Sequence, residues 1–411
     1  MQTILSNARE AAMRLPLLSD EQRSKILEKV SEAIMESAAE LLEANAMDLA
    51  RMSKDNPLYD RLLLNGARLK GIASDMLAVS KLPSPLDRTI EDRTLPNGLR
   101  LRKVSVPYGL VGVIYEARPN VTFDVFSICM KSGNGCILKG GSDADFTNRA
   151  EVTLIKKVLR ECGADENAVT LLDSTHQSAS AMLNAVGYVD LVIPRGGRRL
   201  INFVRDNAKV PCIETGAGVV NTYFDRDGDM EKGKRIVMNA KTRRVSVCNA
   251  LDCLIVHKDR LDDLAALCAQ LADRNVSIIA DERAYAALEG RYPTLSHSDA
   301  DTWGTEFMDY KLAIRTVDSL EQALDHISRY GSGHSECIVS ENAQAVREFQ
   351  LRVDAACVYA NAPTSFTDGA QFGLGAEIGI STQKLGARGP MGLQEMTTYK
   401  WLIEGNGQTR A

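Results

Sequence analysis

Residues 136–144 read C-I-L-K-G-G-S-D-A, a short apolar run followed by two glycines and the start of a helical pattern. The same order recurs along the chain. Apolar runs lie at 111–115, 136–139, 169–172, 189–193 and 219–224. Helical patterns separate them, as at 143–161 and 176–186. Strands that alternate with helices of these lengths predict a doubly wound parallel sheet, covered on both faces and joined by right-handed crossovers.

A second alternation begins after residue 225. Its expected helices are 229–241, 259–273, 319–329 and 342–352, and its expected strands are 253–257, 277–280, 312–317, 337–340 and 356–361. The fold class is therefore α/β with two doubly wound units. A chain of 411 residues is also too long for one simple core.

The N-terminal part is expected to be helical. Apolar residues at helical intervals predict one long amphipathic helix over 19–52, and Ser19 with Gln22 has the spacing of a capping box. A second helical region is expected over 59–82. Further on, P-N-G at 96–98 predicts the turn of an exposed hairpin, which either lies on the surface or pairs with another subunit.

Composition excludes several classes of partner. The chain is 45% hydrophobic and 25% charged, with a net charge of −5 and no strongly basic half, so nucleic acid is a poor candidate. Apolar runs are far shorter than the roughly 20 residues that cross a bilayer. The N-terminus lacks a basic segment followed by an apolar one, so no signal peptide is expected. We expect a cytoplasmic protein without a membrane partner.

The nine cysteines are expected to be free thiols. Their number is odd and none forms a C-x-x-C pair, which argues against a disulfide framework or a structural zinc site, and no metal is expected. Most have apolar neighbours and predict packing, as Cys253 does inside an expected strand. Cys248 differs, because it follows Arg243 and Arg244 in a polar loop where a thiolate can be stabilised. Neighbouring polarity therefore favours Cys248 as a nucleophile, with packing as the alternative.

Two glycine turns follow expected strands at the edge where open α/β sheets bind ligands. The usual G-x-G-x-x-G dinucleotide fingerprint is absent, so a dinucleotide would be held in another way. Lys139, Gly140, Gly141 and Ser142 can contact ribose hydroxyls or a 2′-phosphate. Arg195, Gly196 and Gly197 precede a helix whose N-terminus can face a pyrophosphate. Two ordinary turns are the alternative reading.

Several motifs carry a resemblance to a known family. They are Y-E-A-R-P-N-V-T (115–122), L-K-G-G-S-D-A (138–144), I-P-R-G-G (193–197), I-E-T-G-A-G (213–218), V-C-N-A-L (247–251), Y-G-S-G-H-S-E (330–336) and the glycine-rich run 372–393. With these motifs the chain resembles the aldehyde dehydrogenase superfamily, and more closely its glutamate-5-semialdehyde dehydrogenase branch, the γ-glutamyl phosphate reductases.

The resemblance implies roles for individual residues. Glu214 and Cys248 lie 34 residues apart, counted from 214 to 248, which matches the superfamily spacing and assigns the catalytic thiol to Cys248. Asn120 matches the asparagine whose amide helps form the oxyanion hole. Lys139 matches the lysine at the adenosine ribose, and Glu306 is the best match to the glutamate at the nicotinamide ribose. Arg118, Arg198, Arg243 and Arg244 are candidates for holding the substrate's phosphate and carboxylate.

The implied reaction is an NADPH-dependent reduction of L-glutamyl 5-phosphate to L-glutamate 5-semialdehyde and phosphate through a cysteine thioester, the second step towards proline. The implied NADPH-binding domain comprises 1–94, 107–222 and about 362–389. The implied catalytic domain is 223–361. A β element of 95–106 and 390–411 is expected to form a homodimer or homotetramer. A transient contact with glutamate 5-kinase is a further implication.

Two alternatives and two departures accompany this reading. One alternative is an aldehyde dehydrogenase that releases an acid by hydrolysis, and the other is a dinucleotide-binding protein without chemistry. The branch usually has proline where this chain has Val245. It also usually reads N-A-S-T-R-F-T-D-G, whereas residues 361–369 read N-A-P-T-S-F-T-D-G, so that Pro363 and Ser365 replace a serine and an arginine.

Overall fold

The computed structural model describes residues 1–56, 59–116, 118–216 and 218–410. The chain forms two compact units. Unit 1 consists of 1–215, 373–379 and 391–411, and unit 2 consists of 216–372 and 380–390. Within the described residues, no helix is both long enough and apolar enough to cross a membrane.

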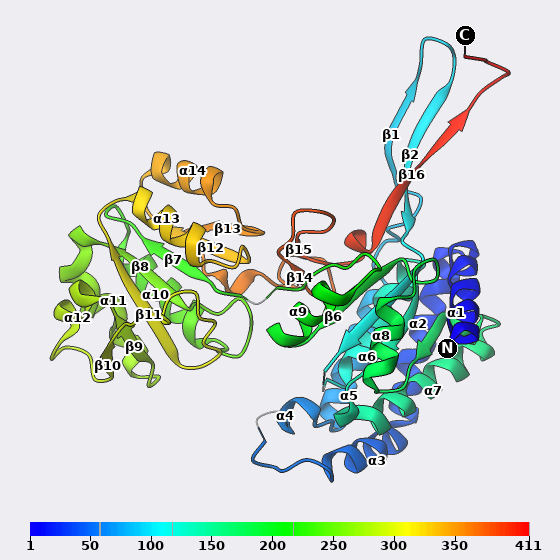
Figure 1. Ribbon diagram of the computed structural model, residues 1–411, viewed down its shortest axis with the longest axis horizontal. Coiled ribbons are helices and arrows are strands. Elements are labelled where there is room, and N and C mark those ends of the chain that lie inside the picture. Colours follow the sequence, from blue (N-terminus) through cyan, green and yellow to red (C-terminus); the bar gives the residue numbers. More distant parts are fainter. Residues whose placement is uncertain (57–58, 117, 217, 411) are drawn as a thin grey trace. The chain divides into compact units, whose positions relative to one another are not determined.

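Unit 1 contains a four-stranded parallel sheet (Figure 1). Its strand order is β5 (Val169–Leu171), β4 (Gly135–Lys139), β3 (Leu110–Tyr115) and β6 (Leu191–Arg195). One face packs against α1 (Gln2–Arg14), α8 (His176–Leu183) and α9 (Arg198–Asn207) in a shared apolar core. Helices α6 (Asn120–Lys131) and α7 (Asp145–Glu161) also contact the sheet. The doubly wound sheet expected for the first half of the chain is confirmed.

Helix α6 has almost no exposed face. Residues 121–131 are all buried except Asp124, and the buried residues include the polar Thr122, Ser127 and Lys131. A pattern that expects one apolar and one exposed face does not describe such a helix, so the sequence pattern did not indicate it. The first residue of the helix is Asn120, one of the expected site residues.

The N-terminal helices of unit 1 are shorter than expected. The capping box is confirmed, since Ser19 Oγ accepts from Gln22 N at 3.1 Å and Gln22 Oε1 accepts from Ser19 N at 2.8 Å. The single helix expected over 19–52 is wrong. Ser37, with φ −96° and ψ 17°, separates two helices. The four helices of this region are α2 (Asp20–Glu36), α3 (Ala38–Leu49), α4 (Tyr59–Leu62) and α5 (Gly66–Ser80).

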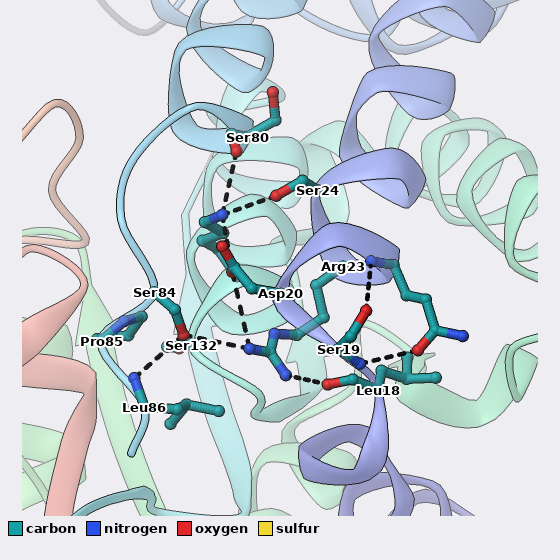
Figure 2. A network of polar contacts seen from close by, with 12 residues as sticks. Leu18, Ser19, Asp20, Arg23, Ser24, Ser80, Ser84, Pro85, Leu86 and Ser132 are labelled. Carbon is teal, nitrogen blue, oxygen red and sulfur yellow. Dashed lines mark hydrogen bonds and ion pairs between the residues drawn. The ribbon is translucent and has the colours of Figure 1, made fainter. Parts of the chain in front are cut away.

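A network of polar contacts around the buried Lys131 joins α2, α5 and α6 (Figure 2). Lys131, the last residue of α6, is buried, and its Nζ lies 2.8 Å from Asp20 Oδ1. The same Nζ donates to Ser24 Oγ at 2.7 Å and to Ser80 O at 3.1 Å. Arg23, on the other side of Asp20, donates to Ser84 Oγ at 3.2 Å. These contacts fix the C-terminal end of α6.

Three antiparallel strands of unit 1 form a separate sheet that extends from its helices (Figure 1). They are β1 (Thr89–Thr94), β2 (Arg100–Pro107) and β16 (Thr397–Glu404), with β2 in the centre. The expected hairpin is therefore present, and the C-terminal segment adds a third strand to it. We call this sheet the β arm.

Unit 2 contains a seven-stranded sheet in which every pairing is parallel. Its order is β10 (Leu295–His297), β9 (Ser277–Ala280), β11 (Lys311–Val317), β8 (Cys253–His257), β7 (Asn221–Phe224), β12 (Ser335–Val339) and β13 (Cys357–Ala360). Its helices are α10 (Met230–Thr242), α11 (Leu264–Ala272), α12 (Glu282–Leu288), α13 (Leu320–Tyr330) and α14 (Ala343–Arg352). A two-stranded ribbon, β14 (Ile380–Ser381) with β15 (Gly389–Pro390), completes it.

Two apolar cores cover the faces of this sheet. Leu254 and Val256 of β8 pack in the core that includes α10, α11 and α12. Cys253 and Ile255 point to the other face, where α13 and α14 contribute. The alternation along β8 is that of a strand buried on both sides.

The division between the units differs from the expected domain limits. Strand β7 pairs with β8 and β12, so it belongs to unit 2. The chain therefore passes from unit 1 to unit 2 between residues 215 and 216, and not between 222 and 223 as expected. The glycine-rich tail is also shared, since 373–379 packs with unit 1 and 380–390 with unit 2. The sequence pattern predicted the strands of both parallel sheets except β10, but it could not indicate which sheet an intervening strand joins.

Candidate active site

Cys248 lies in a turn of unit 2 between α10 and β8, and its side chain is partly exposed. Its neighbour Asn249 is buried and donates from Nδ2 to Thr367 O at 2.9 Å. The carbonyl of Asn249 accepts from Thr364 Oγ1 at 2.9 Å. The turn is therefore held from outside by the segment 364–367, which leaves a thiol that is both positioned and accessible.

Cys253 has a different environment. It is buried in β8, with its sulfur 3.6 Å from His326 Nε2. Burial raises the pKa of the Cys253 thiol far above its ordinary range, and the nearby carboxylates of Glu336 and Asp252 raise it further. A thiol of this kind stays protonated, so Cys253 packs the core as expected. None of the nine cysteines, all of which lie in the described residues, forms a disulfide.

Gly218 contacts both Glu306 and the turn that carries Cys248. The backbone N–H of Gly218 donates to Glu306 Oε1 at 3.0 Å. A Cβ on Gly218 would lie only 1.6 Å from the carbonyl oxygen of Cys248. The structure thus brings the expected nucleophile and the expected ribose-binding glutamate to one place in unit 2, although the local motif around Glu306 was loose.

Two buried charges behind this cluster were not indicated by the sequence. Asp252 accepts from Phe307 N at 3.0 Å and from Val220 N at 3.3 Å, so it ties together the segments that carry Glu306 and Gly218. Burial raises the pKa of Asp252 to about 7, and Lys241 opposes this rise. Burial also lowers the pKa of Lys241 to about 8. Their importance depends on partners far away in sequence, so no local signal could have found them.

Unit 1 has a cavity at the carboxyl edge of its sheet, where Lys139 ends β4. Its volume is about 560 Å³. Four apolar and four polar residues line it: Ile114, Ala179, Leu200, Phe203, Glu116, Lys139, His176 and Arg199. Burial lowers the pKa of Lys139 from its ordinary value. The sequence reading found Lys139 but missed the wall contributed by α8 and α9, whose residues form no motif.

The two glycine turns of unit 1 are closely packed. A Cβ on Gly140 would lie 2.2 Å from Asn148 Nδ2, whereas Ser142 is exposed. A Cβ on Gly196 would lie 2.7 Å from the carboxylate of Glu116. That carboxylate accepts from Gly197 N at 3.0 Å, the amide that we expected to face a pyrophosphate. Glu116 directly follows β3 in the Y-E-A-R-P-N motif, and this position is the sequence feature that could have indicated Glu116 as a site residue.

The remaining expected residues fall in both units. In unit 1, Asn120 Nδ2 donates to Asp124 Oδ2 at 2.7 Å, and Glu214 Oε2 lies 3.9 Å from Arg205 Nη1. The carbonyl of Arg118 accepts from Val121 N at 3.0 Å.

In unit 2, Arg243 and Arg244 are exposed. Arg243 lines a hollow of about 460 Å³ together with Arg235 and Arg274. Ser365, which replaces the branch's usual arginine, is buried and donates from Oγ to Asn239 Oδ1 at 2.6 Å. In the part of the chain that the structure describes, no group of three or more His, Cys, Asp or Glu side chains could hold a metal ion.

Comparisons with known proteins agree with these features. The model of the aldehyde dehydrogenase family matches residues 1–278. The γ-glutamyl phosphate reductase of Parabacteroides distasonis is 59% identical over 409 residues, which cover 99% of both chains. That of Bacteroides fragilis is 60% identical over 402 residues, 97% of both chains.

Solved structures give the same result. The crystal structure of γ-glutamyl phosphate reductase from Thermotoga maritima matches with a TM-score of 0.96 at 38% identity, over 100% of this chain and 99% of that one. An acetylating aldehyde dehydrogenase from Geobacillus thermoglucosidasius shares the fold, with a TM-score of 0.70 at 15% identity, over 100% of this chain and 97% of that one. The chain therefore belongs to the aldehyde dehydrogenase family, in its γ-glutamyl phosphate reductase branch.

Proposed function

We propose that this chain reduces L-glutamyl 5-phosphate to L-glutamate 5-semialdehyde with release of phosphate, using NADPH, in the second step of proline biosynthesis. The observation that carries the proposal is the accessible Cys248 thiol, in a turn whose backbone carbonyl lies against Gly218, the residue whose N–H donates to Glu306. It occurs in a chain that is 59% identical, over almost its whole length, to a γ-glutamyl phosphate reductase.

In the proposed reaction the Cys248 thiolate attacks the acyl carbon of the substrate. The Asn120 amide and the Cys248 backbone N–H stabilise the negative charge on the acyl oxygen. The carbon–oxygen bond to phosphate then breaks, and phosphate leaves with the electron pair, so that the acyl group remains on sulfur as a thioester. NADPH, when bound, supplies the hydride that reduces this acyl group. The carbon–sulfur bond breaks last, which releases the aldehyde and restores the thiolate.

Glu214 is proposed to handle protons or to shape the site. In aldehyde oxidation a carboxylate in this position activates water, but water would destroy the thioester in the direction proposed here. The ion pair of Glu214 with Arg205, at 3.9 Å, is consistent with a carboxylate that is held in place. Arg118, Arg243 and Arg244 are proposed contacts for the phosphate and carboxylate of the substrate.

The cavity of unit 1 is proposed to hold the adenosine half of NADPH. Its apolar wall of Ile114, Leu200 and Phe203 suits a base, and its cations Lys139 and Arg199 suit a 2′-phosphate. The turns 140–142 and 195–197 are proposed neighbours of the ribose and pyrophosphate. Glu306 is proposed to hold the nicotinamide ribose. Lys139→Met should weaken NADPH binding more than NADH binding, as measured by fluorescence titration, and equal losses for both would refute the 2′-phosphate contact.

The β arm is proposed to pair with a second copy of the chain in a homodimer or homotetramer. Its outer strands expose large apolar side chains, with Ile90 at 47%, Tyr399 at 53%, Trp401 at 38% and Ile403 at 62% exposure. Exposed apolar edge strands are normally covered by a partner. Ile403→Lys should reduce the mass measured by light scattering to that of a monomer, and an unchanged mass would exclude this surface. We further expect a cytoplasmic location and a transient contact with glutamate 5-kinase.

One assay separates the proposed reaction from its rivals. With purified protein, glutamate semialdehyde and NADP⁺, reduction of NADP⁺ should require inorganic phosphate, because the reverse reaction must form the acyl phosphate. Phosphate-independent formation of glutamate would instead indicate a hydrolytic aldehyde dehydrogenase. Absence of turnover with intact NADPH binding would indicate a binding protein without chemistry.

A further inference from the structure

Asn120 and Asp124 form a hydrogen-bonded pair one helical turn apart on α6. Residues four apart in a helix lie on the same face, which brings the two side chains together. Asn120 Nδ2 donates to Asp124 Oδ2 at 2.7 Å. Asn120 is exposed, whereas Asp124 is half-buried and is the one residue of 121–131 that is not fully buried.

We infer that Asp124 is a positioning residue for the reaction: its carboxylate fixes the orientation of the Asn120 side-chain amide. This inference rests on the proposed role of Asn120 at the acyl oxygen. An ionised carboxylate only accepts hydrogen bonds, so it must face the NH₂ side of the amide and never its oxygen. One N–H is used by Asp124, and the second N–H remains to donate to the negative charge that develops on the acyl oxygen.

A rotated amide would present its oxygen instead. A carbonyl oxygen beside a developing oxyanion repels it, so the rotated state would oppose the reaction it is meant to assist. Without Asp124 both orientations are open to an exposed asparagine, because the two ends of the amide have nearly the same shape. The carboxylate therefore removes a nonproductive state in advance of substrate binding.

The surroundings of Asp124 make this constraint depend on pH. Burial raises the pKa of Asp124 to about 6, while its hydrogen bond with Asn120 and the charge of Arg195 lower it and the charge of Asp75 raises it. Glu151 on α7 also interacts with Asp124, and burial raises the pKa of Glu151 well above its ordinary value. Asp124 is thus ionised at neutral pH and becomes protonated near pH 6. A protonated carboxyl can donate to the amide oxygen, which permits the rotated state.

The test compares Asp124→Asn with Asn120→Ala and with the double variant. Asp124→Asn keeps the shape but can donate as well as accept. We expect Asp124→Asn to lower kcat for phosphate-dependent NADP⁺ reduction by about 10-fold to 100-fold. This loss should be no larger than the loss in kcat caused by removing an oxyanion donor. The dissociation constant for NADPH should not change. The double variant should be no slower than Asn120→Ala alone, because both changes act on one interaction.

The pH profile supplies a readout that a purely structural role would not move. In the unmodified chain kcat should fall below pH 6, and in Asp124→Asn this acid limb should disappear. Asp124→Glu keeps an acceptor-only carboxylate and should keep the limb, which also covers the case in which Asp124→Asn does not fold. Asp263→Asn is the matched control, and it should leave kcat unchanged. Asp263 belongs to unit 2, and its carboxylate accepts a hydrogen bond of 2.7 Å from Arg260 Nε.

Two results would overturn the inference. In the first, Asn120→Ala slows the reaction but Asp124→Asn keeps an unmodified kcat and acid limb. In the second, the losses in kcat from the two single variants multiply in the double variant. If Asn120→Ala itself leaves kcat unchanged, the proposed oxyanion role of Asn120 is wrong, and the inference about Asp124 is wrong with it. This outcome differs from the two above because in both of those Asn120→Ala slows the reaction.

Discussion

Gly218→Ala tests the arrangement of the catalytic turn most directly. The added Cβ would lie 1.6 Å from the carbonyl oxygen of Cys248, 2.5 Å from its carbonyl carbon and 2.9 Å from its Cα. All three atoms belong to the backbone, so no side chain can rotate away. Since real Cβ contacts are essentially never shorter than 3.0 Å, the new Cβ and the Cys248 carbonyl oxygen must separate by at least 1.4 Å, the difference between 3.0 and 1.6 Å.

Such a displacement should be costly for catalysis and modest for stability. A misplacement of about 1 Å can reduce a rate about 100-fold, so we expect kcat to fall at least that far. Overpacking costs about 1–3 kcal/mol, which a small domain tolerates. The assay is phosphate-dependent NADP⁺ reduction, with alkylation of Cys248 by iodoacetamide as a second measure of thiol access.

Gly71→Ala is the matched control for this substitution. Position 71 is an exposed site in α5, and a Cβ there would meet nothing within 4 Å. It should leave kcat unchanged and stabilise the helix by up to about 1 kcal/mol. If Gly218→Ala keeps kcat within about twofold of the unmodified chain, the close contact between Gly218 and the Cys248 turn is wrong and the reasoning fails.

Three further outcomes are expected. Cys248→Ala should abolish turnover while NADPH still binds. Cys253→Ala should leave kcat unchanged and lower the free energy of unfolding in urea by about 0.5–3 kcal/mol. The reverse pattern would mean that Cys253 is the nucleophile and Cys248 the packing residue. His326 is buried and its pKa is lowered to about 4, so the unfolded chain binds a proton between pH 6.5 and 4 that the folded chain does not, and stability is lost as pH falls through that window. His326→Phe should remove the part of this loss that His326 contributes, about 3 kcal/mol at 1.36 kcal/mol for each pH unit, so that the slope becomes smaller. The buried His334, whose pKa is also lowered to about 4, keeps its own part, and an unchanged slope would exclude His326 as a source. Lys131→Met should destabilise the chain by about 1–3 kcal/mol, because it removes three polar contacts of a buried ammonium. Lys25→Met is the control and should have almost no effect, because Lys25 forms an exposed pair with Glu28 at 3.4 Å. Equal losses of stability from the two substitutions would contradict the role of the network around Lys131.

The sequence predicted the parts of the fold that have a local pattern. Alternating apolar runs and amphipathic helices indicated both sheets, because most strands are short and largely buried and most covering helices have one exposed face. Helix α6 was missed because it is buried nearly all round. The break at Ser37 was missed because the apolar positions of α2 and α3 continue with nearly the same spacing across it.

The sequence proposed site residues where a motif carried them. Cys248, Lys139 and Asn120 stand in recognisable segments. Neighbouring polarity favoured Cys248 over Cys253, and the 34-residue spacing to Glu214 that the resemblance implies assigned the thiol to Cys248. Lys241, Asp252 and Asp124 were not found, because each acquires its importance from burial and from a partner that only folding brings near. Glu116 shows the limit most clearly, since its carboxylate accepts from Gly197 N, 81 residues further along the chain.

The buried network around Lys131 holds one end of α6, and the packing of residues 121–131 holds the rest of the helix. Lys131 is fixed at one end of the 12-residue helix, and Asn120 stands at the other. At about 1.5 Å for each residue the helix is about 18 Å long, so a rotation of about 3° about its Lys131 end would move Asn120 by about 1 Å. The contacts of Lys131 therefore affect how precisely the Asn120 side chain is placed, and Asn120 is the side chain that we propose at the acyl oxygen. Changing those contacts offers an engineer a way to alter that precision without altering any residue proposed to contact the substrate.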